Sequence, residues 1–305
     1  MITQKIKNLL IWFSWTLWRK TFLFWERFGF HIIPNSFYQV IPDTRTLKND
    51  LWAKPGELIG INLKEKEQLA LLGVFEEKYK DEYSKFSSEP TQVPSEYYFN
   101  NQMFGPVDAE ILYSMIRHFK PKNIFEIGSG FTTFLMARAV LKNKNEGHDC
   151  KLISHDPYSN EIIKQKFPGF SELKDRKVEE ADLNEFLELE ANDLLFIDSS
   201  HALRIGGDVW FEYLKILPRL KPGVIIHIHD IFLPAEYPRE WVLKYFRFWN
   251  EQYLLQAFLT LNDSFEVLWA GHYVHSKFPE KLESAFNSYD RKKIGPVSFW
   301  IRRVK

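Results

Sequence analysis

Five polar or titratable side chains follow two short apolar runs, and their types suit the binding of a divalent cation. Asp198 and His201 lie after one run, and His227, His229 and Asp230 lie at the end of the next. Such groups are costly to bury without a partner or a purpose. Asp198, His229 and Asp230 can supply oxygen and nitrogen ligands for a cation, and His201 is the candidate general base. Carboxylates with water suit Mg²⁺, whereas an imidazole ligand favours Mn²⁺ or another transition metal.

Strand geometry limits how many of the last three side chains can face one pocket. In a strand, His227 and His229 point to the same side and Asp230 to the other. At most one or two of them therefore face the pocket, unless the strand ends at His229. We interpret His227 as a core histidine with a local partner, because buried polar groups find hydrogen-bond partners.

A glycine turn, EIGSG at residues 126–130, lies between an apolar run and a helical pattern. Its glycines allow a tight turn and the close approach of a ligand beneath a helix N-terminus. A dinucleotide fingerprint requires a third glycine where this sequence has Thr133. S-adenosylmethionine (SAM) has no phosphate, and its ammonium group can meet an acid such as Glu126. The turn therefore indicates a SAM site, the alternative being a turn whose glycines serve packing alone.

The elements that must position these residues alternate between helix and strand from Val107 onward. Apolar runs suit buried parallel strands, and helical spacing separates them. We predict strands over 123–127, 152–155, 175–178, 194–198, 224–229, 265–270 and 297–303, and helices over 108–120, 132–142, 159–166, 182–190, 207–217 and 238–258, with Asp108 as an N-cap. This pattern predicts an α/β fold with a Rossmann-like, doubly wound and mostly parallel sheet, whose ligands bind at the carboxyl ends of the strands.

The glycine turn resembles motif I of the class I SAM-dependent methyltransferases. The resemblance implies that Gly128, Ser129 and Gly130 face the aminoacyl group of SAM and that Glu126 orients it. Asp156 follows the next strand, roughly 20–30 residues beyond the turn, where an acid binds ribose hydroxyls. The resemblance also places Asp182 near the adenine, although Asp182 suits a helix N-cap equally well.

Asp198-x-x-His201 with the pair His229-Asp230 is similar to the metal-dependent sugar O-methyltransferases of macrolide biosynthesis, and more distantly to catechol O-methyltransferase. The macrolide-sugar group carries Asp-x-x-His followed by Asp-Asp, so His229 is a departure from its pattern. Residues 107–303 also resemble a broad group of bacterial methyltransferases, with its habitual phrases at 197–201 and 220–223. The resemblance implies a small-molecule acceptor such as a sugar, without naming one.

Residues 1–105 are predicted to be an N-terminal extension, and residues 106–305 the SAM-dependent domain. Residues 1–30 read as an aromatic-rich helix with Trp12, Trp15 and Trp18 at every third position, and a further helix is expected over 64–83. Such a helix suits packing within the protein, a homo-oligomer, or a peripheral contact with a membrane surface. Residues 31–105 are otherwise irregular and are expected to wrap the following domain or to cover its site.

The composition of the chain limits its expected binding partners and cellular compartment. Lys plus Arg and Asp plus Glu both number 40, which argues against a general attraction to nucleic acid. The sequence shows no signal peptide and no run of about 20 apolar residues. The single Cys150 forms no internal disulfide, so we expect a cytoplasmic protein, with membrane association as the open alternative.

These patterns together predict a SAM-dependent methyltransferase that acts on a hydroxyl. A cation lowers the pKa of such a hydroxyl and holds it in line with the sulfonium, while a base removes its proton. Three alternatives stay open: a metal-independent N-methyltransferase, a metal-dependent hydroxylase-like relative and a non-catalytic SAM-binding protein.

Overall fold

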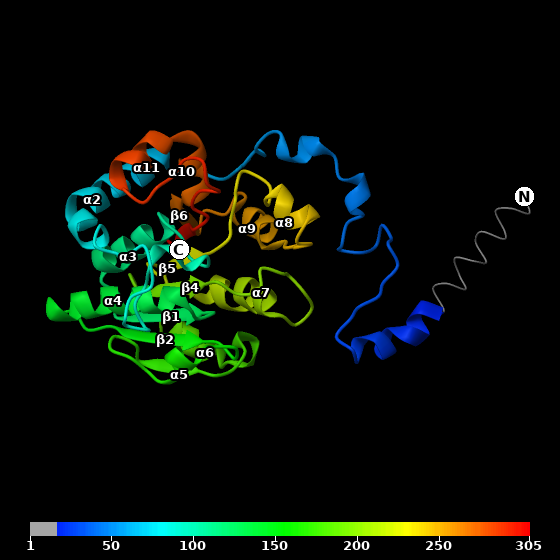
Figure 1. The fold of residues 1–305 in the computed structure, drawn as a ribbon, viewed down its shortest axis with the longest axis horizontal. Helices are drawn as coiled ribbons and strands as arrows, with labels where there is room; N and C mark the ends of the chain where they lie inside the picture. Colours follow the sequence, from blue (N-terminus) through cyan, green and yellow to red (C-terminus); the bar gives the residue numbers. More distant parts are fainter. Residues whose placement is uncertain (1–16) are drawn as a thin grey trace, which may run out of the picture. The chain divides into compact units, whose positions relative to one another are not determined.

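The computed structural model describes residues 17–305 and divides the chain into two compact units. One unit comprises residues 1–53 with 240–248, and we call it the N-terminal unit. The other comprises residues 54–239 with 249–305, and we call it the sheet unit (Figure 1). Each unit is described by itself.

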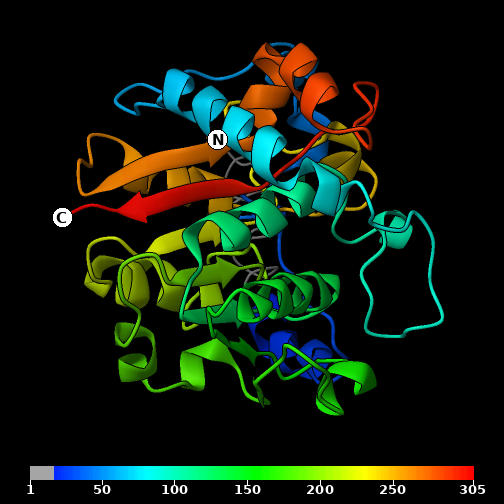
Figure 2. The same ribbon diagram turned by 90° about the vertical axis from the view of Figure 1, so that its left-hand side faces the viewer.

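A seven-stranded sheet in the order β3-β2-β1-β4-β5-β7-β6 forms the centre of the sheet unit. The first five strands of this order run parallel, whereas β7 is antiparallel to both β5 and β6. Figure 2 shows β6 in orange and β7 in red running in opposite directions. The predicted Rossmann-like fold is confirmed. The strand bounds are β1 Asn123–Ile127, β2 Lys151–His155, β3 Glu172–Lys174, β4 Leu194–Ile197, β5 Ile225–Ile228, β6 Phe265–Ala270 and β7 Phe299–Arg303.

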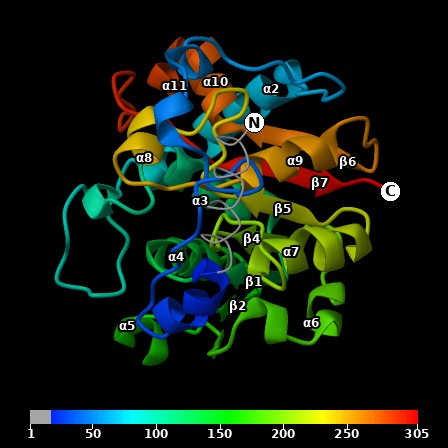
Figure 3. The same ribbon diagram turned by 90° about the vertical axis from the view of Figure 1, so that its right-hand side faces the viewer.

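Helices cover both faces of the sheet, with one hydrophobic cluster beneath each layer. One cluster joins the sheet to α2, α3, α4 and α11, and the other joins it to α6, α7, α9 and the turns near them. Figure 3 shows α4 and α7 on opposite sides of the strands. The helix bounds are α2 Glu65–Tyr83, α3 Asp108–Phe119, α4 Phe131–Asn145, α5 Glu161–Lys164, α6 Leu183–Leu187, α7 Asp208–Phe211, α8 Arg239–Leu243, α9 Glu251–Leu259, α10 Gly271–Lys277 and α11 Pro279–Ala285.

Residues 54–105 add the long helix α2 and a series of loops to the core of the sheet unit. The amide of Gln68 on α2 accepts a hydrogen bond from the backbone N–H of Ala270 at 2.8 Å. Tyr83 at the other end of α2 donates to the carbonyl of Ala285 on α11 at 3.2 Å. The helix predicted over 64–83 is confirmed.

Three local predictions are wrong. Residues 175–178 are not a strand: β3 lies at Glu172–Lys174, where its backbone pairs with β2, and Val178 begins a 3-10 turn. The helix predicted over 238–258 is two helices, α8 and α9, because residues 244–250 leave the helical conformation. Asp108 is the first residue of α3 and not its N-cap, because its carboxylate accepts the backbone N–H groups of Val297 and Ser298, both at 2.9 Å.

The described part of the N-terminal unit contains little regular structure. Residues 17–26 are helical, two 3-10 turns follow at Thr44–Thr46 and Asn49–Trp52, and α8 lies mostly within this unit. The helix predicted over residues 1–30 falls partly on residues 1–16, which lie outside the described residues. Within residues 17–305, none of the helices is long and apolar enough to cross a membrane.

Candidate active site

The glycine turn joins the ends of three neighbouring strands. Gly128 follows β1 with a φ of 83°, a conformation that glycine adopts at little cost. Its N–H donates to the carbonyl of His155 at the end of β2, at 3.1 Å. Its α-carbon lies so close to the carbonyl oxygen of Asp198, after β4, that a side chain here would collide with it. The cofactor turn predicted from sequence is therefore in direct contact with the strand end that carries Asp198.

Glu126 lies beneath this turn and is fully buried. Its carboxylate accepts hydrogen bonds from the hydroxyls of Thr132 at 2.6 Å, Thr133 at 2.7 Å and Ser154. Burial raises the pKa of Glu126 to about 7, although these three hydroxyls act in the opposite direction. Glu126 thus links the turn to the start of α4 and to β2 through hydrogen bonds. Its contact with the aminoacyl group of SAM stays a prediction.

Asp156 holds the other side of the turn. One oxygen accepts both the backbone N–H and the hydroxyl of Ser129, at 3.0 and 2.6 Å, and the second accepts the N–H of Tyr158 at 2.7 Å. Asp182 is the N-cap of α6 and accepts the N–H of Asn184 at 3.0 Å. The N-cap alternative for Asp182 is therefore present in the structure. The proposed contacts of both acids with ribose and adenine stay predictions.

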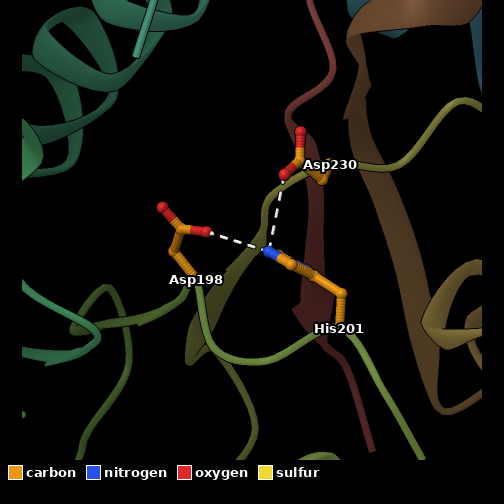
Figure 4. Close-up of side chains that lie close together, drawn as sticks. All are labelled: Asp198, His201 and Asp230. Atoms are coloured by element: carbon orange, nitrogen blue, oxygen red, sulfur yellow. Dashed lines mark ion pairs between the residues drawn. The ribbon is translucent and has the colours of Figure 1, made fainter. Parts of the chain in front are cut away.

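Asp198, His201 and Asp230 converge at the carboxyl ends of β4 and β5 (Figure 4). Nε2 of His201 lies 3.3 Å from Oδ1 of Asp198 and 3.4 Å from Oδ2 of Asp230. His201 and Asp230 have φ values of 58° and 55°, in the left-handed region of the backbone. Non-glycine residues pay for such a conformation, and it is concentrated at functional sites. Strand β5 ends at Ile228, so the alternation of side chains stops there and both His229 and Asp230 can face the site.

One buried acid contacts this cluster, and a second interacts with the first through its charge. Nδ1 of His201 lies 2.9 Å from Oε2 of Glu251, which is fully buried at the start of α9. Glu212, also fully buried, accepts the hydroxyl of Ser199 at 3.2 Å. Burial, followed by the charge of Glu251, raises the pKa of Glu212 well above its usual range. Glu212 lies in a π-helical turn, Glu212–Ile216, a local irregularity that is frequent at functional sites.

His229 lies beside the cluster, between three carboxylates. Its Nδ1 is 3.5 Å from Asp198 and 3.8 Å from Asp230, and its Nε2 is 3.9 Å from Asp108. Burial alone would lower the pKa of His229, but the charges of Asp198 and Asp230 raise it to about 9. At neutral pH, His229 is therefore a buried cation in this arrangement.

His227 does not join the cluster. Its Nε2 lies 3.0 Å from the hydroxyl of Ser298, and its ring stacks on Phe196 with centroids 3.9 Å apart. Burial holds the pKa of His227 well below its usual range. This is the core histidine with a local partner that the sequence predicts.

The electrostatics of His201 bear on its expected role as a base. Burial alone would lower the pKa of His201, but its hydrogen bonds with Asp198 and Glu251 raise it well above the usual value. An imidazolium can neither accept a proton nor bind a metal, so either role requires His201 to lose its proton. A carboxylate on the far ring nitrogen is found both at metal-bound histidines and at general bases, so the expected role of His201 as a base stays a prediction. The geometry brings Nε2 of His201 into the cluster with Asp198 and Asp230, and the expected role of His229 as a ligand stays a prediction.

Comparison with known proteins agrees with this reading of the turn. Residues 125–231 match the family model of a methyltransferase domain. The matched segment runs from β1 to just beyond β5, so it contains the glycine turn, Asp198, His201 and Asp230. Over these residues the chain is therefore similar to a methyltransferase domain.

Two further similarities cover more of the chain. An uncharacterized protein of Archaeoglobus fulgidus is 29% identical over 196 residues, which are 62% of this chain and 84% of that protein. The solved structure of an O-methyltransferase from Bacillus cereus in complex with SAH is 13% identical and aligns with a TM-score of 0.37, over 79% of this chain and 92% of that one.

Proposed function

We propose that this chain is a SAM-dependent methyltransferase that transfers a methyl group to a hydroxyl of a small molecule, such as a sugar or glycan precursor, with the help of a divalent cation. One observation carries the proposal: Gly128 of the cofactor turn lies directly against the backbone of Asp198, whose side chain belongs to the acidic cluster. A methyl donor at the turn and a hydroxyl at the cluster would therefore be neighbours. The family match at residues 125–231 supports the methylation, and the cluster supports the hydroxyl acceptor.

The donor atoms of Asp198, His201 and Asp230 fit a divalent cation. All three atoms lie within 4.8 Å of one another, and the two separations at His201 are 3.3 and 3.4 Å. Ligands about 2.0–2.3 Å from one ion are separated by roughly 3 Å, so small movements would complete the site. Asp198 and Asp230 are 30% and 14% exposed, which leaves the cluster open to an ion and an acceptor. The imidazole ligand favours Mn²⁺ over Mg²⁺.

When bound, the cation would lower the pKa of the acceptor hydroxyl and hold its oxygen in place. Glu251 fixes the ring of His201 through Nδ1, so that Nε2 faces the two aspartates. His229 adds a positive charge beside the same acids. Because His201 serves as a ligand in this proposal, we assign the proton of the acceptor to a carboxylate or to solvent.

The cofactor side of the site relies on the turn. Ser129 and Gly130 present backbone groups at the N-terminus of α4, and Asp156 fixes Ser129 from the end of β2. We propose that SAM lies over this turn, with Glu126 beneath its aminoacyl end. Asp156 would meet the ribose and Asp182 the adenine.

The proposal is tested with the full chain, methyl-labelled SAM and a panel of hydroxylated acceptors. We expect SAM to bind in calorimetry without a cation, and label transfer to require Mn²⁺ or Mg²⁺ and to stop in EDTA. Asp198→Asn alters only the side chain, so it should retain SAM binding and lose more than about 100-fold in cation affinity and turnover. Asp149→Asn, a substitution of an acid on the surface, is the matched control.

Each alternative function gives a different result in this experiment. Binding of SAM without label transfer to any acceptor would favour the non-catalytic SAM-binding protein, and failure to bind SAM would reject SAM dependence altogether. Unchanged turnover in EDTA would reject the cation and favour an N-methyltransferase. A product heavier by an oxygen atom instead of a methylene group would identify the hydroxylase-like alternative.

A further inference from the structure

The two units of this neutral chain carry opposite charge. The N-terminal unit, residues 1–53 with 240–248, contains nine Lys or Arg residues and four Asp or Glu residues. The sheet unit contains 31 basic and 36 acidic residues. The N-terminal unit also holds six of the ten tryptophans of the chain. Although the whole chain is neutral, its N-terminal unit is therefore basic and rich in aromatic residues. Such a composition is typical of segments that bind anionic surfaces.

The described part of this unit exposes its apolar side chains. None of residues 17–53 or 240–248 is buried. Leu23, Phe28 and Phe30 are 64%, 62% and 63% exposed, and Phe37 is 93% exposed. Further exposed members of the set are Phe24, Ile32, Tyr38, Val40, Ile41, Tyr245 and Phe246. An apolar surface of this extent marks an interaction site.

Cations lie among these apolar side chains. Arg19 and Lys20 lie within the helical segment 17–26 and Arg27 follows it directly, while Glu26 is the one acid between residues 17 and 42. A second copy of this chain would bring the same basic surface against itself, and like charges would oppose that contact. An anionic lipid surface accommodates both the exposed apolar side chains and the cations among them. Aromatic and aliphatic side chains enter the interface, while Lys and Arg bind the phosphates.

We propose that the N-terminal unit docks on an anionic lipid surface, with the exposed side chains of residues 23–41 entering the interface and Arg19, Lys20 and Arg27 at the headgroups. This docking is independent of the proposed methyl transfer. It brings the sheet unit to a membrane, where lipid-bound acceptors are available to it.

Vesicle binding by the full chain tests the proposal. The protein is mixed with phosphatidylcholine vesicles that contain or lack phosphatidylglycerol, and the bound fraction is measured by flotation. We expect binding to the anionic vesicles, with weaker binding as the salt concentration rises. The variant Arg19→Gln/Lys20→Gln/Arg27→Gln should lose on the order of 100-fold in partition coefficient for anionic vesicles, from about tenfold or less for each cation.

Two further variants separate the apolar contribution from a general effect of substitution. Phe24→Ser/Phe28→Ser/Phe30→Ser should lose binding to anionic vesicles, whereas Ile205→Ser, at a fully exposed apolar residue of the sheet unit, should bind like wild type. These side chains are exposed, so thermal unfolding should be unchanged in every variant.

Three outcomes would overturn the proposal. The first is that wild type stays unbound, and the second is that the aromatic variant binds as wild type does. The third is that Phe24, Phe28 and Phe30 are needed for self-association in solution, which would assign the surface to a second copy. Calorimetry with SAM on the same preparations keeps this test separate from the proposed function, because a protein that binds vesicles and not SAM rejects only the latter.

Discussion

The contact between Gly128 and Asp198 makes a specific prediction about two glycines of one turn. At Gly128, an added methyl group would collide with the carbonyl oxygen of Asp198 and lie 3.1 Å from its carbon. The φ of 83° also disfavours any side chain. At Gly130, two residues away, no atom lies within 4 Å of the added carbon and φ is 172°. Gly128→Ala and Gly130→Ala therefore form a matched pair that differs in this contact.

The magnitude follows from two contributions at Gly128. The left-handed backbone costs about 1–2 kcal/mol for a residue with a β-carbon. Forcing a methyl group against a backbone that cannot swing aside costs about 1–3 kcal/mol more. We expect Gly128→Ala to lower the free energy of unfolding by about 2–5 kcal/mol. Gly130→Ala should lower it by less than about 1 kcal/mol.

Urea denaturation followed by circular dichroism measures both changes, and calorimetry with SAM and Mn²⁺ measures their consequences. Relief of the collision must move the end of β4, so Gly128→Ala should weaken Mn²⁺ binding as well as SAM binding. Gly130→Ala can weaken SAM binding by crowding the ligand, but it should leave Mn²⁺ binding unchanged. Equal stability of the two variants, or equal Mn²⁺ affinity, would refute the proposed coupling of turn and cluster.

Three other predictions concern buried acids. Glu251→Gln leaves His201 less firmly oriented and should weaken Mn²⁺ binding by about 10–100-fold with unchanged SAM affinity, as measured by calorimetry. The pKa of Glu126 is raised from 4.5 to about 7, so its contribution to stability is present below pH 4.5 and is lost as the pH rises through 7. Between pH 4.5 and 8, the free energy of unfolding in urea should therefore fall by about 3 kcal/mol more in wild type than in Glu126→Gln, in which the other buried acids are unchanged. The buried carboxylate of Asp193 accepts two backbone N–H groups at the start of β1, both at 2.9 Å. Asp193→Ala should therefore lower the free energy of unfolding in urea by about 2–4 kcal/mol, and a loss below about 1 kcal/mol would contradict this account.

The sheet could be predicted because its central strands are continuous apolar runs. β1, β4 and β5 are buried on both faces, and this burial leaves a clear mark in sequence. β3 left no such mark, since its residues Glu172, Leu173 and Lys174 are each only half-buried at the edge of the sheet. The break between α8 and α9 was equally hidden, because residues 244–250 keep the aromatic composition of the helices around them.

Of the site residues, only those that follow the predicted strands could be predicted from the sequence. The carboxyl ends of β4 and β5 gave Asp198, His201 and Asp230, but their orientation depends on two left-handed residues that have no sequence signature. Glu251 reaches His201 from 50 residues away, so its role required the folded chain. Glu212 did have a signal, because it shares a helical stripe with buried apolar residues, where an acid is out of place.

His229 stands where the macrolide-sugar O-methyltransferases have an aspartate, and the charges around it bear on which residues would bind a cation. Asp198, Asp230, Glu251 and Asp108 are four carboxyl groups around two imidazoles, so the acids outnumber the imidazoles even when both imidazoles are protonated. A divalent cation that takes neutral His201 as a ligand, with His229 still protonated, reduces this excess of negative charge. Buried charge is tolerated when it is paired, which supports a cation in this cluster. An aspartate in place of His229 would make the loaded cluster more negative by two charges, so the histidine and the ligand set Asp198, His201 and Asp230 are consistent with each other.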